Sequence, residues 1–180
     1  NYPRYFDLKY NVKVPSVEEI QKVLDDKTMV VSYFITEATS RIFIYQITKD
    51  KFSVTNIAQP EDLDHYISGL RNAIRYQVYD LFELTASSLF KTLFPGSIPK
   101  SVSKLVIIPS GRLGTVPFGA LLTGKSRSKT EDYTSLPYLA REYAITYQYA
   151  SALFYQNKNI SRTDDAPGKV FLCAPVHFNG

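Results

Sequence analysis

Ser110, Gly111, Arg112 and Gly114 are the residues whose types and spacing come closest to a functional motif. They follow a short apolar run, and a loop at the carboxyl end of a parallel strand is where open α/β sheets usually bind ligands. Backbone N–H groups of this loop, beside the Arg112 guanidinium, can supply a site for an anion or a protein partner. The spacing matches neither the phosphate-binding loop nor the dinucleotide-binding glycine pattern. We therefore favour a tight strand-to-helix turn, with ligand binding at 110–114 as the alternative.

Two further candidates for catalysis, Ser110 and His65, lack the partners that their chemistry needs. Ser110 is not in the Gly-x-Ser-x-Gly context that exposes a nucleophilic serine. His65 follows Asp64 in a segment with helical spacing, but a general base needs a nucleophile or substrate within hydrogen-bond reach, and no partner motif is visible. We expect His65 to be a partly exposed helix residue.

Cys173 is the single cysteine of the chain, and its neighbours argue against a nucleophilic role. Phe171, Leu172 and Ala174 surround it with apolar side chains, which raise the pKa of a thiol and hide the sulfur. His177 lies four positions later and cannot reach Cys173 in an extended strand unless the chain reverses. We predict a buried core cysteine and assign no catalytic residue.

Length, charge and hydropathy limit the class of protein. The 180 residues are 44% hydrophobic, which is enough for a single well-buried core. The formal net charge of +4 comes from interspersed charges of both signs, so no nucleic-acid partner is expected. No apolar run approaches the roughly 20 residues of a membrane span. One cysteine forms no internal disulfide, which fits a reducing compartment. The sequence thus predicts a soluble, cytoplasmic chain without membrane contact, cofactor or metal.

The apolar residues predict an α/β fold around a buried strand at 105–109. That run has no polar face, as expected for a strand of a parallel sheet that is covered on both sides. Ser110 to Gly114 then gives a tight turn, and 116–122 resumes a helix-capable apolar pattern. Before it, three segments rich in β-branched and aromatic residues predict an antiparallel meander: 29–35, 41–47 and 52–57.

Helical spacing appears on both sides of the meander. Ser16, with Glu19 three residues later, predicts a capped packing helix whose apolar face includes Val17, Ile20 and Leu24. After Pro60, two helical stretches or one bent helix extend to Pro95. The remaining segments read in order as a polar loop at 123–135, a strand at 143–148, a helix from Ala150, a polar loop at 157–168 and a buried strand at 169–175.

With these elements in order, the chain resembles the amino-terminal part of the CHAT domain, the caspase-like domain associated with tetratricopeptide repeats in bacterial proteins. The most specific matches are two segments. The run from Val106 to Phe118, VIIPSGRLGTVPF, resembles the strand, turn and Pro-Phe signature of the family, and the run from Leu139 to Tyr147 resembles its L-x-x-x-Y-A-[IV] strand. The lead-in, the 30–57 hairpin and 170–180 extend the likeness over nearly the whole chain.

The resemblance implies a caspase-like three-layer sandwich, with an amino-terminal β-meander and parallel core strands flanked by helices. It divides the chain into a lead-in with a packing helix at 1–28 and a pseudo-caspase part at 29–180. CHAT proteins are related to cysteine peptidases that carry a His-Gly pair and a later Ala-Cys segment. Neither is present here: Phe178 follows His177, and Ala174 follows Cys173 in an apolar run.

Three functional hypotheses follow. The first is a non-catalytic amino-terminal portion of a CHAT-family cysteine peptidase, a scaffold or regulatory half for a downstream catalytic half. Its partners are that half, upstream tetratricopeptide repeats of the same protein, and other proteins. The second is a hydrolase that uses Ser110, which lacks a base. The third is an autonomous protein- or anion-binding module that uses the 110–114 loop.

Overall fold

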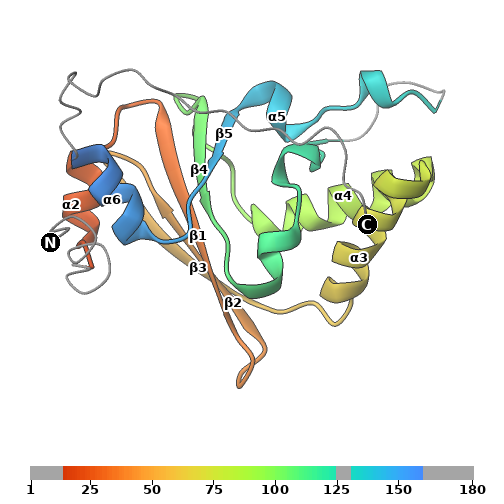
Figure 1. The fold of residues 1–180 in the computed structure, drawn as a ribbon, viewed down its shortest axis with the longest axis horizontal. Helices are drawn as coiled ribbons and strands as arrows, with labels where there is room; N and C mark the ends of the chain where they lie inside the picture. The colour runs from red at the N-terminus through yellow and green to blue at the C-terminus, as the bar shows by residue number, and fades with distance from the viewer. Residues whose placement is uncertain (1–13, 125–130, 160–180) are drawn as a thin grey trace, which may run out of the picture.

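The computed structural model describes residues 14–124 and 131–159. Within them the chain forms one mixed sheet with strand order β3-β2-β1-β4-β5. The strands are β1 (Thr28–Thr36), β2 (Arg41–Ile47), β3 (Phe52–Ala58), β4 (Lys104–Ile108) and β5 (Ala144–Tyr147). Figure 1 shows the sheet between two layers of helices, which makes the fold an α/β three-layer sandwich. The predicted α/β fold class is therefore confirmed.

The sheet has an antiparallel half and a parallel half. β1 pairs with β2, and β2 with β3, in antiparallel register, with Tyr33 opposite Ile44 and Ile44 opposite Thr55. The predicted meander is thus confirmed. β4 runs parallel to both neighbours, with Val106 opposite Val30 of β1 and Thr146 of β5. Four of its five residues are buried, because helices cover both of its faces, as the apolar run predicted.

Helices α3 (Leu63–Tyr76) and α4 (Tyr79–Leu93) cover one face of the sheet. They pack against each other, and a Cβ at Gly69 of α3 would lie 3.0 Å from Cγ2 of Thr85 in α4. Gln77 between them has φ 55°, the left-handed conformation that ends α3 and reverses the chain. The two predicted helical stretches are separate helices. Their buried residues include Leu63, Leu70, Ala86, Leu89 and Leu93.

The opposite face is covered by α2 (Val17–Lys22) and α6 (Ser151–Asn159). α2 begins with the predicted capping box: the Glu19 N–H donates to Ser16 Oγ at 3.2 Å, and the Ser16 N–H donates to Glu19 Oε2 at 2.9 Å. Ile20 of α2 and Phe154 of α6 then pack in a second core cluster against the sheet. The chain therefore builds a core on each face of one sheet.

Two segments differ from the sequence prediction. Residues 116–122 do not form an α-helix. Only the 3-10 turn Phe118–Ala120 forms there, because the chain becomes extended at Leu121, whose carbonyl accepts the Leu139 N–H at 2.8 Å. Leu122 bridges to Tyr138 instead. The strand predicted at 143–148 forms as β5, but the 139–147 run, which resembles a strand of the family, begins with a short helix, α5 (Leu139–Glu142), because pairing with β4 starts only at Ala144. Leu139 is fully buried in this turn.

Candidate functional site

The 110–114 loop leaves the carboxyl end of β4, as predicted, and folds into a 3-10 helix, Gly111–Thr115. Gly111 has φ 51°, a conformation that a side chain would strain. The Leu113 N–H donates to the Ser110 carbonyl and the Val116 N–H to the Leu113 carbonyl, both at 3.1 Å. These bonds use the loop's own amides and carbonyls to close a tight turn.

Side chains of the loop and of the segment after it anchor the turn in the core. Leu113 and Phe118 are fully buried. The Phe118 ring lies 5.5 Å from the ring centroid of Tyr33 on β1 and 6.2 Å from that of Tyr147 on β5. Tyr33 is itself buried, and its hydroxyl donates to the Leu93 carbonyl at 3.0 Å. Phe118 therefore fills the core beneath the turn.

Arg112 forms an ion pair that its sequence position does not reveal. Its Nη1 lies 2.5 Å from Oδ2 of Asp64, in the first turn of α3, and the Arg112 carbonyl accepts the Thr115 hydroxyl at 2.9 Å. The Arg112 side chain is 34% exposed and that of Asp64 is 62% exposed. The guanidinium charge is thus matched locally by a carboxylate, which weakens the loop as a site for anions.

His65 lies in the first turn of α3, on the same side of the molecule as the loop, but it does not form a catalytic pair there. Its Nδ1 is 3.5 Å from Oδ1 of Asp62, and its side chain is 86% exposed. No hydrogen bond joins His65 to Ser110 in the described part of the chain. The structure therefore brings Asp64 and Arg112 together and leaves His65 on the surface, as a helix histidine.

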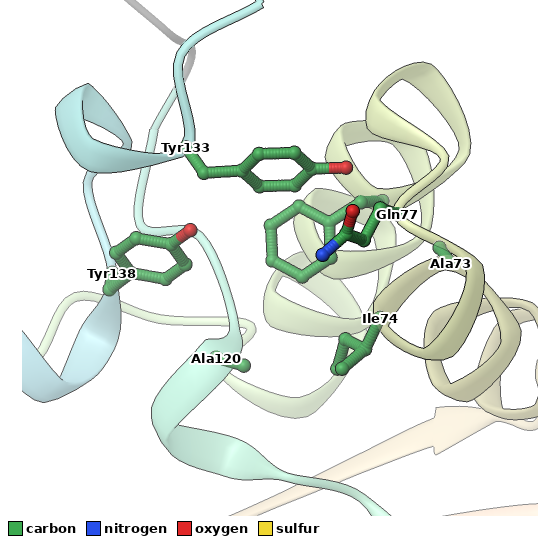
Figure 2. A pocket seen from close by; sticks show the side chains of 7 residues that line it. Ala73, Ile74, Gln77, Ala120, Tyr133 and Tyr138 are labelled. Atoms are coloured by element: carbon green, nitrogen blue, oxygen red, sulfur yellow. The ribbon is translucent and has the colours of Figure 1, made fainter.

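A cavity of about 490 Å³ opens at the far end of α3, in a region without a recognisable sequence motif. Figure 2 shows side chains from three separate segments around it: the α3–α4 junction, the turn at Ala120, and residues 133–138. Its lining is Ala73, Ile74, Gln77, Phe82, Ala120, Tyr133 and Tyr138. The tyrosines were visible in the sequence only as scattered aromatics, and no spacing rule joins them to Gln77.

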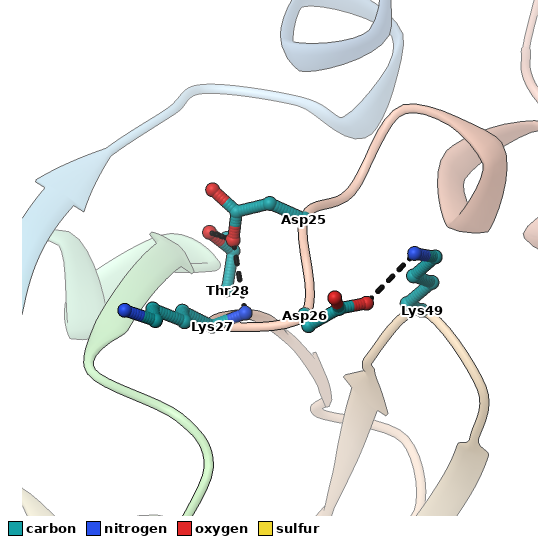
Figure 3. Close-up of polar contacts among 5 residues, drawn as sticks. All are labelled: Asp25, Asp26, Lys27, Thr28 and Lys49. Atoms are coloured by element: carbon teal, nitrogen blue, oxygen red, sulfur yellow. Dashed lines mark hydrogen bonds and ion pairs between the residues drawn. The ribbon is translucent and has the colours of Figure 1, made fainter.

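A polar cluster on the other side of the sheet ties the starts of β1 and β4 together. Asp25 Oδ1 accepts the Thr28 hydroxyl at 2.6 Å and the Lys27 N–H at 3.0 Å, and its Oδ2 lies 3.0 Å from Lys104 Nζ. The Thr28 bond, the Lys104 bond and the Lys27 N–H together lower the pKa of Asp25 to about 2. Figure 3 shows Asp25, Lys27 and Thr28 of this cluster beside the ion pair of Asp26 and Lys49, whose Oδ1 and Nζ atoms lie 2.7 Å apart.

β5 is an edge strand in the described part of the sheet. Only β4 pairs with it there, through bonds such as Ala144 N–H to the Ser103 carbonyl and Gln148 N–H to the Ile107 carbonyl, both 2.9 Å. In a parallel ladder alternate residues bond to opposite neighbours, so the N–H groups of Ile145 and Tyr147 face the open edge. A further strand has hydrogen-bonding groups available at this place.

The remaining sequence candidates fall partly outside the described residues. Cys173, His177 and the predicted strand at 169–175 lie beyond residue 159. Among residues 14–124 and 131–159, no three His, Cys, Asp or Glu side chains gather closely enough to hold a metal ion. The same residues include no helix with the length and apolar character of a membrane span.

Comparison with known proteins gives no family for the chain. No protein-family model matches it, and no curated protein matches it either. Inferences about its function therefore rest on its own residues and geometry.

Proposed function

We propose that this chain is the non-catalytic amino-terminal part of a caspase-like unit of the CHAT type, and that it acts as a scaffold or regulatory half for a catalytic half that follows it. The observation that carries the proposal is the open parallel edge of β5. The parallel half of the sheet consists of β1, β4 and β5, and β5 is its outermost described strand. The outward N–H groups of Ile145 and Tyr147 have no strand partner among the described residues. A downstream strand can extend the sheet at this edge.

The chemistry of the described side chains favours a scaffold role over a catalytic one. Ser110 has no base, His65 is paired with Asp62 on the surface, and Arg112 is matched by Asp64. The alternative, an anion- or protein-binding module at the 110–114 loop, gains no support from a guanidinium that already has a carboxylate partner.

Amide hydrogen exchange of the protein, together with whatever follows Gly180, tests the proposal. If a strand pairs with β5, the N–H groups of Ile145 and Tyr147 exchange as slowly as those of Ala144 and Gln148, which donate to carbonyls beside or within β4 and serve as internal controls. Fast exchange of Ile145 and Tyr147 beside slow controls would leave the edge open and contradict the proposal. The sequence beyond Gly180 gives a second check, because a catalytic half requires a His-Gly pair and a later Ala-Cys segment.

A further inference from the structure

The cavity at the α3–α4 junction has the size and walls of a small-molecule site. Its volume of about 490 Å³ falls within the range of roughly 300–1,000 Å³ that is typical of ligand pockets. Its walls come from elements that are fixed independently of a ligand. Ala73 is a buried residue of α3, Phe82 is a buried residue of α4, and Ala120 ends the turn that is anchored by Phe118. The cavity is thus formed by the fold itself.

Aromatic rings hold one another in place along one wall. The Tyr133 ring meets Phe82 edge-on at a centroid distance of 5.7 Å and Tyr79 edge-on at 5.1 Å. The Tyr138 ring is tilted against that of Phe82, at a centroid distance of 6.0 Å. Such edge and tilted contacts are the favourable geometry for aromatic pairs, so the cluster can accept another ring in the same way.

The polar groups of the described lining residues are few and uncharged. Tyr133 and Tyr138 keep their protons at neutral pH because the ordinary pKa of a tyrosine hydroxyl is about 10, and burial raises the pKa of both further. Gln77 brings a side-chain amide, which Figure 2 shows on the side of the cavity that faces the Tyr133 and Tyr138 rings. The Tyr133 hydroxyl is buried and has no hydrogen-bond partner in the described structure. An unsatisfied buried hydroxyl is uncommon in folded proteins and calls for a partner.

We propose that this cavity binds an uncharged aromatic molecule with one hydrogen-bonding group, its ring against Phe82 and Tyr138 and its polar group toward the Gln77 amide and the Tyr133 hydroxyl. A charged ligand has no counter-charge among the lining residues that the structure describes and loses its hydration there. The small side chains of Ala73 and Ala120 leave the room for the ring. The inference is independent of the β5 edge and therefore stands or falls separately from the proposed function.

Indole is a suitable probe because it is neutral and aromatic and carries one N–H donor. The chain contains no tryptophan, so indole fluorescence excited beyond the tyrosine absorption reports the ligand alone. We expect saturable binding with a dissociation constant of about 1 mM or tighter, in line with the affinity of small ring compounds for apolar pockets. Indole-3-carboxylate, the same ring with a negative charge, should bind about tenfold more weakly because its charge is desolvated without a partner.

Cavity-filling variants locate the site. Ala120→Leu occupies the space of the ring and should weaken indole binding about tenfold or more. Ile74→Phe, at a position that is 45% exposed, closes the cavity without burdening the core and keeps the test valid if Ala120→Leu fails to fold. Ala58→Leu on β3 adds the same bulk away from the cavity and should leave binding unchanged. Gln77→Gly removes the amide and should weaken indole binding while the fold is retained.

Two results would overturn the inference. One is the lack of saturable indole binding to the unmodified protein. The other is binding that survives both Ala120→Leu and Ile74→Phe, or that Ala58→Leu weakens equally, because the ligand would then lie elsewhere on the protein.

Discussion

Nη1 of Arg112 lies 2.5 Å from Oδ2 of Asp64, and this ion pair joins the loop after β4 to the first turn of α3. The two residues are 48 positions apart in the chain. The pair matters for function because Arg112 is the one cationic residue of the 110–114 loop, and Asp64 already neutralises its charge. It matters less for stability, because both side chains reach solvent and surface ion pairs contribute only about 0–1 kcal/mol.

Replacing Phe118 by alanine should be far more damaging than replacing Arg112. Phe118 is fully buried among the rings of Tyr33, Phe94 and Tyr147, and deleting a buried phenyl ring costs about 3–5 kcal/mol. Arg112→Ala should lower the free energy of unfolding by about 1 kcal/mol at most. Denaturant unfolding of both variants measures the ranking. A larger loss for Arg112→Ala would mean that the loop depends on its charge and would favour a binding role for it.

Gly111→Ala should destabilise the turn by about 1–2 kcal/mol, because a side chain in the left-handed region meets the backbone. Gly114→Ala is the matched control: it lies in the same 3-10 turn, has no left-handed φ, and its added Cβ would meet nothing within 4 Å. Thermal unfolding of the two variants compares them directly. Equal losses would show that the left-handed backbone conformation of Gly111 does not limit the stability of the loop.

Gln77→Gly should stabilise the fold by about 0.5–1 kcal/mol, since glycine relieves the left-handed strain at the end of α3 but costs backbone entropy. Arg71→Gly, in the middle of the same helix, should instead cost about 1 kcal/mol. Both values come from denaturant midpoints and slopes. If Gln77→Gly destabilised the protein, the Gln77 side chain would have to make contacts worth more than the strain.

Asp25 should give the stability of the protein an acid dependence. Its pKa falls from 3.8 in a model compound to about 2 in the fold, so its stabilisation is complete above about pH 4 and disappears as the pH falls through about 2. The side chain is 49% exposed, which keeps the effect within about 1 kcal/mol.

Thr28→Val removes the hydrogen bond that lowers the pKa of Asp25 most and preserves the shape of a nearly buried side chain. The Asp25 carboxyl should then titrate closer to its ordinary value, which carbon-detected NMR of the carboxyl group can follow. An unchanged titration in this variant would assign the shift to Lys104 and the Lys27 N–H instead.

The chain by itself should show no peptidase activity, because it lacks a His-Gly pair and an Ala-Cys segment. Purified protein mixed with peptides ending in arginine or lysine should release no product above the buffer rate. Cys173→Ala is the control that separates turnover by this protein from turnover by a contaminating peptidase. Turnover that this substitution removes would make Cys173 a nucleophile and refute the prediction.

The local patterns of the sequence determined most of the elements. Alternating and continuous apolar runs marked β1 to β4, since a strand buried on both faces leaves no room for polar residues. Ser16 and Glu19 marked the start of α2, because a capping box needs only residues three apart. Two more features could be recognised from the sequence: Gly111 fits a strained turn, and Phe118 is a large apolar side chain in the segment that follows this turn.

The tertiary structure decided what depends on residues far apart in the chain. It placed β1 rather than β4 in the middle of the sheet and paired Arg112 with Asp64. It also replaced the expected helix at 116–122 by a 3-10 turn, after which Leu122 bridges to Tyr138. It also assembled Gln77, Ala120 and Tyr133 around one cavity. Short-range spacing carries no information on such long-range contacts, because they depend on how the helices pack against the sheet. That packing is fixed only when the whole core forms.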